Sequence, residues 1–181
     1  MNWAGFDPWF CARMLLHGWH PVSPLSHPAL VRRAFFSDRC PEADVRAFQR
    51  RLSRFESFLW PLGMLLPFVD PRRLLRSITG WDANVDVDRV LVMAGTADRM
   101  VSRDVAEETA RVYRTAFSRL VGEGVIEAPD AEIRPLIGEG GMDNSGHGVR
   151  LAWVPGSAHH LQNDVTWEVG AVKLFEFIRQ L

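Results

Sequence analysis

Two segments of the sequence place a residue that can carry chemistry shortly after an apolar run. In RVLVMAGTADRMV, residues 89–101, Asp98 follows a run that ends at Gly95. In VRLAWVPGSAHHL, residues 149–161, His159 follows a run that ends near Pro155. A carboxylate hydrogen-bonded to an imidazole fixes its tautomer and stabilises its protonated form, which leaves the other ring nitrogen free to take a proton. Asp98 and His159 are therefore candidates for a general-base pair.

Each of these segments begins with a run that is typical of a buried strand. Residues 89–95 and 149–155 are almost continuously apolar or β-branched, which predicts strands buried on both faces of a parallel sheet. A helix is expected after each strand, with Ser102 as N-cap of the first and Asn163 or Asp164 as N-cap of the second. This order predicts an α/β fold, in which loops beyond the carboxyl ends of the strands carry the chemistry.

The spacing of apolar residues also predicts which side of each helix is buried. The expected stripe of the first helix is Val105, Thr109, Val112, Ala116 and Leu120, and that of the last helix is Trp167, Ala171, Leu174, Phe175, Ile178 and Leu181. Residues 122–148 are rich in glycine and acidic residues, which favours a long surface loop between the two units.

Residues 1–81 have another pattern, rich in aromatic residues and proline and without a clear strand signal. Helices are expected within residues 28–36, 41–59 and 71–80, with Pro41 at a first helical position. The chain is therefore divided near residue 82 into a helical region, 1–81, and an α/β region, 82–181.

Residues 82–181 resemble the C-terminal half of the α/β-hydrolase superfamily. RVLVMAGTADRMV is similar to the segment that carries the triad acid, and VPGSAHHLQNDVTWEVGAVKLFEFI to the segment with the triad histidine and the final helix. Residues 1–81 resemble the helical cap that such enzymes insert over the active site. The resemblance implies Asp98 as acid and His159 as base, although Ala158 stands where the family usually has glycine.

The same resemblance implies an ester or a lipid-like acyl compound as the substrate of the intact parent enzyme. Caps over such sites present apolar surface to the substrate, and five cap residues are candidates for that wall. They are Phe58, Trp60, Leu62, Met64 and Leu65. Tyr113, the only tyrosine, lies outside the cap, which argues against an epoxide hydrolase, whereas dehalogenation stays open.

The sequence departs from the family at the nucleophile. The family order is Ser, acid, His, with the serine on a G-x-S-x-G elbow, and no serine ahead of Asp98 has these flanking glycines. The oxyanion-hole loop of an early strand is also missing. We therefore expect a truncated gene model, a fragment of a longer protein, or a remnant that needs a partner, and no triad activity from residues 1–181 alone.

Two further expectations follow from a hydrolase fold of this extent. A sheet of only two parallel strands leaves an edge unpaired, and such an edge favours self-association. The alternative to an enzyme is a non-catalytic, hydrolase-like module that binds a partner or an apolar ligand through its cap.

Composition limits the remaining classes. The 181 residues are 47% hydrophobic and 24% charged, as in ordinary globular proteins, and a net charge of −1 gives no indication of a nucleic-acid partner. The longest apolar run is too short for a membrane span. Cys11 and Cys40 fit a reducing, cytoplasmic location, with a single bridge left open. No cofactor is expected, and no metal, because His17, His20 and His27 with Cys11 lack a second tight pair of ligands.

Overall fold

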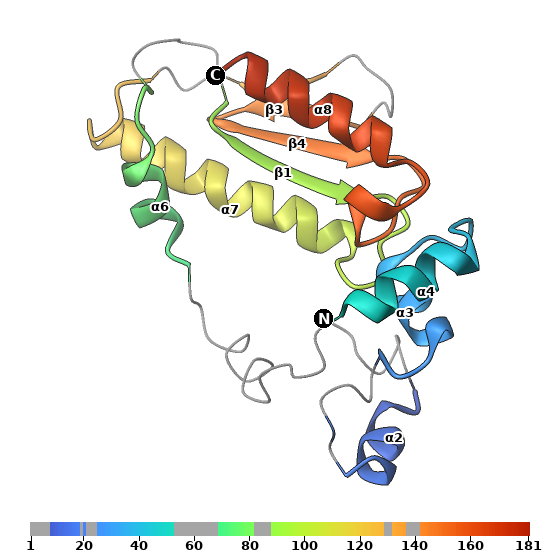
Figure 1. Ribbon diagram of the computed structural model, residues 1–181. Helices are drawn as coiled ribbons and strands as arrows, with labels where there is room; N and C mark the ends of the chain where they lie inside the picture. Colours follow the sequence, from blue (N-terminus) through green and yellow to red (C-terminus); the bar gives the residue numbers. More distant parts are fainter. Residues whose placement is uncertain are drawn as a thin grey trace.

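The protein has a mixed α/β architecture in which helices cover both faces of one sheet (Figure 1). The prediction of an α/β fold is therefore confirmed at this level. The computed structural model describes residues 8–18, 20, 25–52, 69–81, 88–128, 132–136 and 142–181.

The described part of the sheet contains four strands in the order β1-β4-β3-β2. β1 and β4 are parallel and correspond to the two predicted strands, whereas β4 with β3 and β3 with β2 are antiparallel. The register aligns the last residues of the parallel pair, Gly95 and Val154, so both chains leave the sheet at the same edge. The strands are β1 (Val90–Gly95), β2 (Arg134–Pro135), β3 (Asn144–Gly146) and β4 (Val149–Val154).

One face of the sheet is covered by α7 (Arg103–Gly122) (Figure 1). Ala106 and Ala110 of this helix pack with buried side chains of both parallel strands, among them Leu151 and Trp153. The small alanine side chains let the helix lie close to the sheet.

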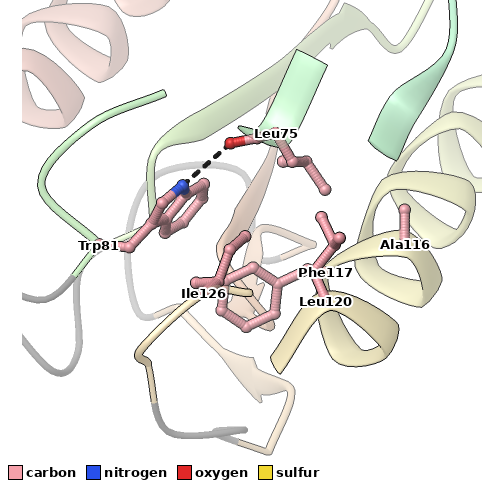
Figure 2. Packing of buried hydrophobic residues seen from close by; sticks show 6 residues of the cluster. All are labelled: Leu75, Trp81, Ala116, Phe117, Leu120 and Ile126. Atoms are coloured by element: carbon pink, nitrogen blue, oxygen red, sulfur yellow. Dashed lines mark hydrogen bonds between the residues drawn. The ribbon is translucent and has the colours of Figure 1, made fainter. Parts of the chain in front are cut away.

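The C-terminal half of α7 packs on a second apolar cluster (Figure 2). Trp81 is buried there, and its Nε1 donates a hydrogen bond of 3.1 Å to the carbonyl oxygen of Leu75 in α6 (Pro71–Ser77). This bond satisfies the polar end of a buried indole. The cluster consists of Leu75, Trp81, Ala116, Phe117, Leu120 and Ile126.

The other face of the sheet is covered by α8 (Trp167–Arg179) (Figure 1). Its buried residues are Gly170, Lys173 and Phe177. Gly170 faces Val154 of β4, and a Cβ added there would lie 3.4 Å from a methyl group of that residue, an ordinary packing distance. Lys173 forms a 2.5 Å ion pair with Asp143, which satisfies its charge under the helix.

Part of the predicted core stripe of α7 is confirmed, because Ala116 and Leu120 are buried. The rest of that stripe and the stripe of the last helix are corrected. In α7, Val105 and Val112 are exposed, because the neighbouring alanines face the sheet instead. In α8, the large residues expected as core are exposed by 42–60%, and the buried stripe is the adjacent one. The exposed residues are Trp167, Leu174, Phe175, Ile178 and Leu181.

The segment 122–148 was expected to be a long surface loop. It differs from that expectation, because it contributes β2 and β3 to the sheet. β3 pairs with β4 and so covers an edge that was expected to be unpaired. Among the described residues, β1 is one edge strand of the sheet and β2 is the other. Residues 90–93 of β1 are half-buried rather than buried on both faces.

The described residues up to 81 contain helices and no strand, as the sequence predicts. These helices are α2 (Phe10–Leu16), α3 (Pro28–Phe35), α4 (Glu42–Arg51) and α6. α6 begins at Pro71, where the Asp70 carboxylate caps two backbone N–H groups. Pro41 is the N-cap of α4 rather than its first residue.

α3 and α4 lie beyond the carboxyl ends of β1 and β4, where the chemistry was predicted (Figure 1). α6 instead packs on α7. The division near residue 82 stays a prediction. None of the helices in the described part of the chain combines the length and the hydropathy needed to cross a bilayer.

Candidate active site

The loops that follow β1 and β4 bring Asp98 and His159 into contact. The Nδ1 atom of His159 lies 2.9 Å from Oδ2 of Asp98. The Asp98 side chain is only 4% exposed, whereas that of His159 is 33% exposed. The carboxylate is thus shielded from solvent, and the imidazole stays partly accessible.

Asp98 is held by its own loop. Its Oδ1 atom accepts hydrogen bonds from the backbone N–H groups of Met100 and Val101, at 2.7 and 2.9 Å. This is a turn in which an aspartate side chain replaces a backbone acceptor. One carboxylate oxygen therefore closes the turn, and the other is left for His159.

The loop of His159 is held by close backbone contact with the end of β1. The N–H of Ala97 donates a 2.9 Å hydrogen bond to the carbonyl oxygen of Ser157, and the hydroxyl of Thr96 accepts one of 2.8 Å from Gly156. A Cβ placed on Gly95 would lie only 2.2 Å from the carbonyl oxygen of Ser157. Glycine is therefore required at position 95 for the two loops to meet.

His160 has a different environment from His159. Its ring lies edge-on to Phe48 with centroids 4.5 Å apart and stacks on Phe36 at 6.0 Å. Burial lowers the pKa of His160, and the neighbouring His159 adds to this effect. The His160 ring thus packs in an aromatic cluster, and the imidazole that is hydrogen-bonded to Asp98 is that of His159.

Residues at the end of α3 and in the turn after it contact the histidine loop, and the sequence did not predict them as part of the site. The Phe35 ring lies 6.1 Å from that of His159, and the Phe35 carbonyl oxygen accepts a 2.8 Å hydrogen bond from the N–H of His160. Ser37 bonds to Asp164, which the sequence predicts only as a helix cap. The sequence of residues 28–36 predicts a short helix but carries no signal for these partners.

The five predicted cap residues of the substrate wall lie outside the described residues. They are Phe58, Trp60, Leu62, Met64 and Leu65. The wall therefore stays a prediction, and Phe35 is the apolar residue that the structure places beside the imidazole.

No hydroxyl group of a described serine forms a hydrogen bond with the His159 ring. Ser145 donates a 2.5 Å hydrogen bond to Asp88 at the opposite end of β1, and Ser118 contacts His147. Within the described residues, the only hydrogen bond of the His159 ring is the one to Asp98. Its Nε2 atom is therefore without a partner in that part of the chain.

Cys11 and Cys40 are free thiols, the first exposed and the second buried. In the described ranges, no group of three or more His, Cys, Asp or Glu side chains could hold a metal ion. The geometry at the carboxyl ends of β1 and β4 suits proton transfer by an imidazole that a buried carboxylate orients. No protein-family model, curated protein or solved structure matches the chain.

Proposed function

We propose that Asp98 and His159 form the acid–base pair of an α/β-hydrolase type of site that acts on an ester or a lipid-like acyl compound. The observation that carries the proposal is the 2.9 Å contact between the two side chains, from the carboxyl-end loops of adjacent parallel strands. Partial α/β-hydrolase architecture, with α3 and α4 as part of a cap, belongs to the same proposal.

In the proposed mechanism, Asp98 accepts the Nδ1 proton of His159 in a hydrogen bond and keeps Nε2 free as a base. Nε2 takes the proton of an attacking hydroxyl as its oxygen bonds to the acyl carbon. The same proton then passes to the leaving alkoxide as the ester bond breaks, which restores the neutral imidazole. The partial exposure of the His159 side chain supports this role.

The proposal assigns the base and its orienting acid but no nucleophile. Because no G-x-S-x-G elbow precedes Asp98, residues 1–181 alone are expected to lack turnover by the serine mechanism. The attacking hydroxyl has to come from another chain, from water or from an added alcohol.

An acyl-transfer assay with added methanol tests the base. The purified chain is incubated with p-nitrophenyl butyrate, and the release of p-nitrophenol and formation of methyl butyrate are followed. General-base action predicts a rate that rises with methanol concentration and is lost in His159→Ala. His27→Asn is the matched control, because asparagine also provides the N-cap acceptor that His27 supplies to Ala29.

Equal rates in the wild type and in His159→Ala would remove the base assignment. Labelling of the wild type by a fluorophosphonate, together with methanol-independent turnover that His159→Ala abolishes, would instead overturn the expectation that this chain carries no serine nucleophile.

The second candidate is a non-catalytic module that binds an apolar ligand or partner through its helical region. Exposed apolar residues on α2 favour it, because Leu15 and Leu16 are 65% and 85% exposed. A wild type without acyl transfer, combined with ligand binding that Leu15→Ser and Leu16→Ser weaken, would support this candidate over the first.

Two lesser expectations remain part of the proposal. The free thiols of Cys11 and Cys40 are compatible with a reducing, cytoplasmic location. Self-association would use the edge strand β1, and sedimentation at increasing protein concentration tests it.

A further inference from the structure

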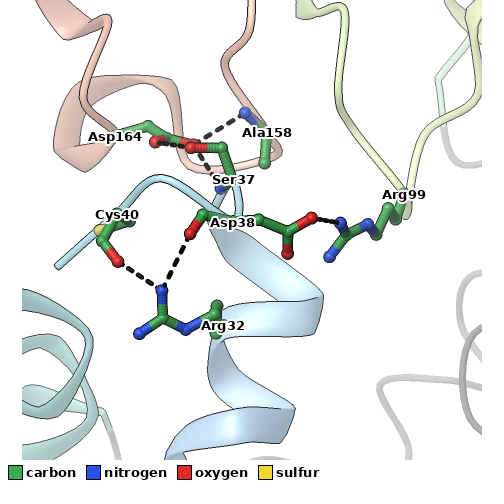
Figure 3. A network of polar contacts seen from close by, with 7 residues as sticks. All are labelled: Arg32, Ser37, Asp38, Cys40, Arg99, Ala158 and Asp164. Atoms are coloured by element: carbon green, nitrogen blue, oxygen red, sulfur yellow. Dashed lines mark hydrogen bonds and ion pairs between the residues drawn. The ribbon is translucent and has the colours of Figure 1, made fainter. Parts of the chain in front are cut away.

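Asp164 is a buried carboxylate that links the histidine loop to the end of α3. It is 1% exposed. Its Oδ2 atom accepts hydrogen bonds from the backbone N–H groups of Ser37, at 2.7 Å, and Ala158, at 2.9 Å. Its Oδ1 atom accepts bonds from the Ser37 hydroxyl, at 2.6 Å, and from the N–H of Val165, at 2.7 Å. Figure 3 shows these contacts between the loop and the turn after α3, apart from the one to Val165.

The charged form of Asp164 is favoured by these donors. Burial by itself raises the pKa of this carboxyl, but the hydrogen bonds from Ser37, Ala158 and Val165 outweigh it and hold the pKa below its ordinary value. A carboxylate with four donors exerts a strong constraint on each of them, because hydrogen bonds to a charged group are stronger than neutral ones.

The backbone on both sides of His159 is fixed by this arrangement. Ala158, directly before it, donates its N–H to Asp164, and His160, directly after it, donates its N–H to the carbonyl oxygen of Phe35. Phe35 accepts the second bond directly, whereas the first bond goes to the Asp164 carboxylate, which Ser37 holds by two further hydrogen bonds. Both contacts therefore lead to residues 35–37 at the α3 end. The imidazole therefore extends from a backbone that is held at both neighbouring residues.

A role as helix cap does not account for Asp164. α8 begins at Trp167 with Thr166 as its N-cap, and no carboxylate oxygen of Asp164 accepts a hydrogen bond from the first residues of that helix. Three of its four donors belong to Ser37 and Ala158, so its contacts are directed mainly toward the α3 end and the loop that carries His159.

We propose that Asp164 is a positioning residue for His159: its carboxylate anchors the histidine loop on Ser37, so that Nδ1 of His159 meets Asp98 when the α3 end is in place. This inference rests on the proposed function for its catalytic meaning. Its structural content, the dependence of the Asp98–His159 hydrogen bond on Asp164, is independent of any activity.

The test is NMR spectroscopy of the isotope-labelled chain. An Nδ1 proton held by a carboxylate gives a protected, strongly downfield resonance, and amide exchange reports on the backbone of Ala158 and His160. In Asp164→Asn, the Nδ1 resonance of His159 should be lost, and the Ala158 amide should exchange at least about tenfold faster. Ser37→Ala removes one donor and should give a smaller change in the same direction.

A second buried Asp–Ser pair in the same chain supplies matched controls. Asp88 is 4% exposed and accepts the Ser145 hydroxyl at 2.5 Å, at the opposite end of β1. Asp88→Asn and Ser145→Ala should leave the His159 resonance and the Ala158 exchange rate unchanged. If Asp164→Asn does not fold, Ser37→Ala against Ser145→Ala carries the comparison.

Retention of the Nδ1 resonance in folded Asp164→Asn, or equal Ala158 exchange in Ser37→Ala and Ser145→Ala, would overturn the proposal. A wild type that shows the resonance but no methanol-dependent acyl transfer would remove the proposed function and leave the positioning role standing. The two failures are therefore distinguishable.

Discussion

The loops after β1 and β4 hold the two members of the pair in different ways. Asp98 is fixed by backbone N–H groups within its own turn, from Met100 and Val101. His159 depends on distant partners, because its loop rests on Gly95 and is anchored through Asp164 and the end of α3. The acid is thus positioned by local sequence, and the base by tertiary packing.

This difference indicates which substitutions should affect Asp98 and which should affect His159. Substitutions in the turn of Asp98 should alter the acid and leave the rest of the molecule in place. Other substitutions would disturb the tertiary contacts that hold the histidine loop. They should move the base and also lower the free energy of unfolding, because the same contacts hold the α3 end against that loop.

Gly95→Ala should have the largest effect. Its Cβ would lie 2.2 Å from the carbonyl oxygen of Ser157 and 2.6 Å from that of Ala158, and backbone atoms cannot give way as a flexible side chain can. We expect a loss of about 3 kcal/mol in the free energy of unfolding, measured by urea denaturation, together with loss of the His159 resonance.

Gly122→Ala is the control for this substitution. Nothing lies within 4 Å of the added Cβ at the end of α7, and alanine favours helix. This variant should be unchanged or more stable by up to about 1 kcal/mol. Equal free energies of unfolding for the two variants would show that the histidine loop tolerates a displacement from the end of β1.

Substitutions of Asp98 separate its turn from its pairing with His159. Asp98→Ala removes the acceptor of two backbone N–H groups and of the imidazole, and should cost about 2 kcal/mol in urea unfolding. Asp98→Asn keeps an acceptor for the turn and should cost about 1 kcal/mol. Its amide would favour the His159 tautomer with the proton on Nε2, so both variants should lose methanol-dependent acyl transfer. Full transfer activity in Asp98→Asn would contradict the orienting role.

The packing of His160 among aromatic rings should make the free energy of unfolding depend on pH. The lowered pKa of His160, caused mainly by burial, means that the folded state binds this proton less readily than the unfolded chain. Its contribution to stability is therefore present above the ordinary value of 6.5 and is lost as the pH falls below it toward the folded pKa.

We expect His160→Phe to lose less stability than the wild type between pH 7.5 and 5.5, measured by urea unfolding at each pH. Asp88, whose pKa burial raises, acts in the opposite direction, but it is common to both proteins and cancels in the comparison. Identical slopes for His160→Phe and the wild type would contradict the lowered pKa of His160.

The sequence predicts the local features of this site well. Apolar runs with turn residues after them predicted β1, β4 and the positions of Asp98 and His159, because strand preference and turn chemistry act over a few residues. The contact of Ser37 with Asp164, 127 residues apart, has no such local signal.

The errors in the fold have the same origin. Periodicity predicted both flanking helices but selected the wrong stripe of α8, since the sheet accepts the stripe with Gly170 and leaves Phe175 exposed. β3, with the sequence NSG, has no strand pattern of its own and depends on pairing with β4. Partners far along the chain determine these features.

The smallest effect is expected at an ion pair between the acid loop and the turn after α3, that of Arg99 with Asp38. The two charges lie 2.6 Å apart (Figure 3), but the Asp38 side chain is 76% exposed, so water and salt screen the attraction. Asp38→Ala should cost no more than about 0.5 kcal/mol in urea unfolding and leave the His159 resonance in place. A loss of that resonance would show that the acid loop, like the histidine loop, depends on the α3 end, and the contrast between local and tertiary positioning would then fail.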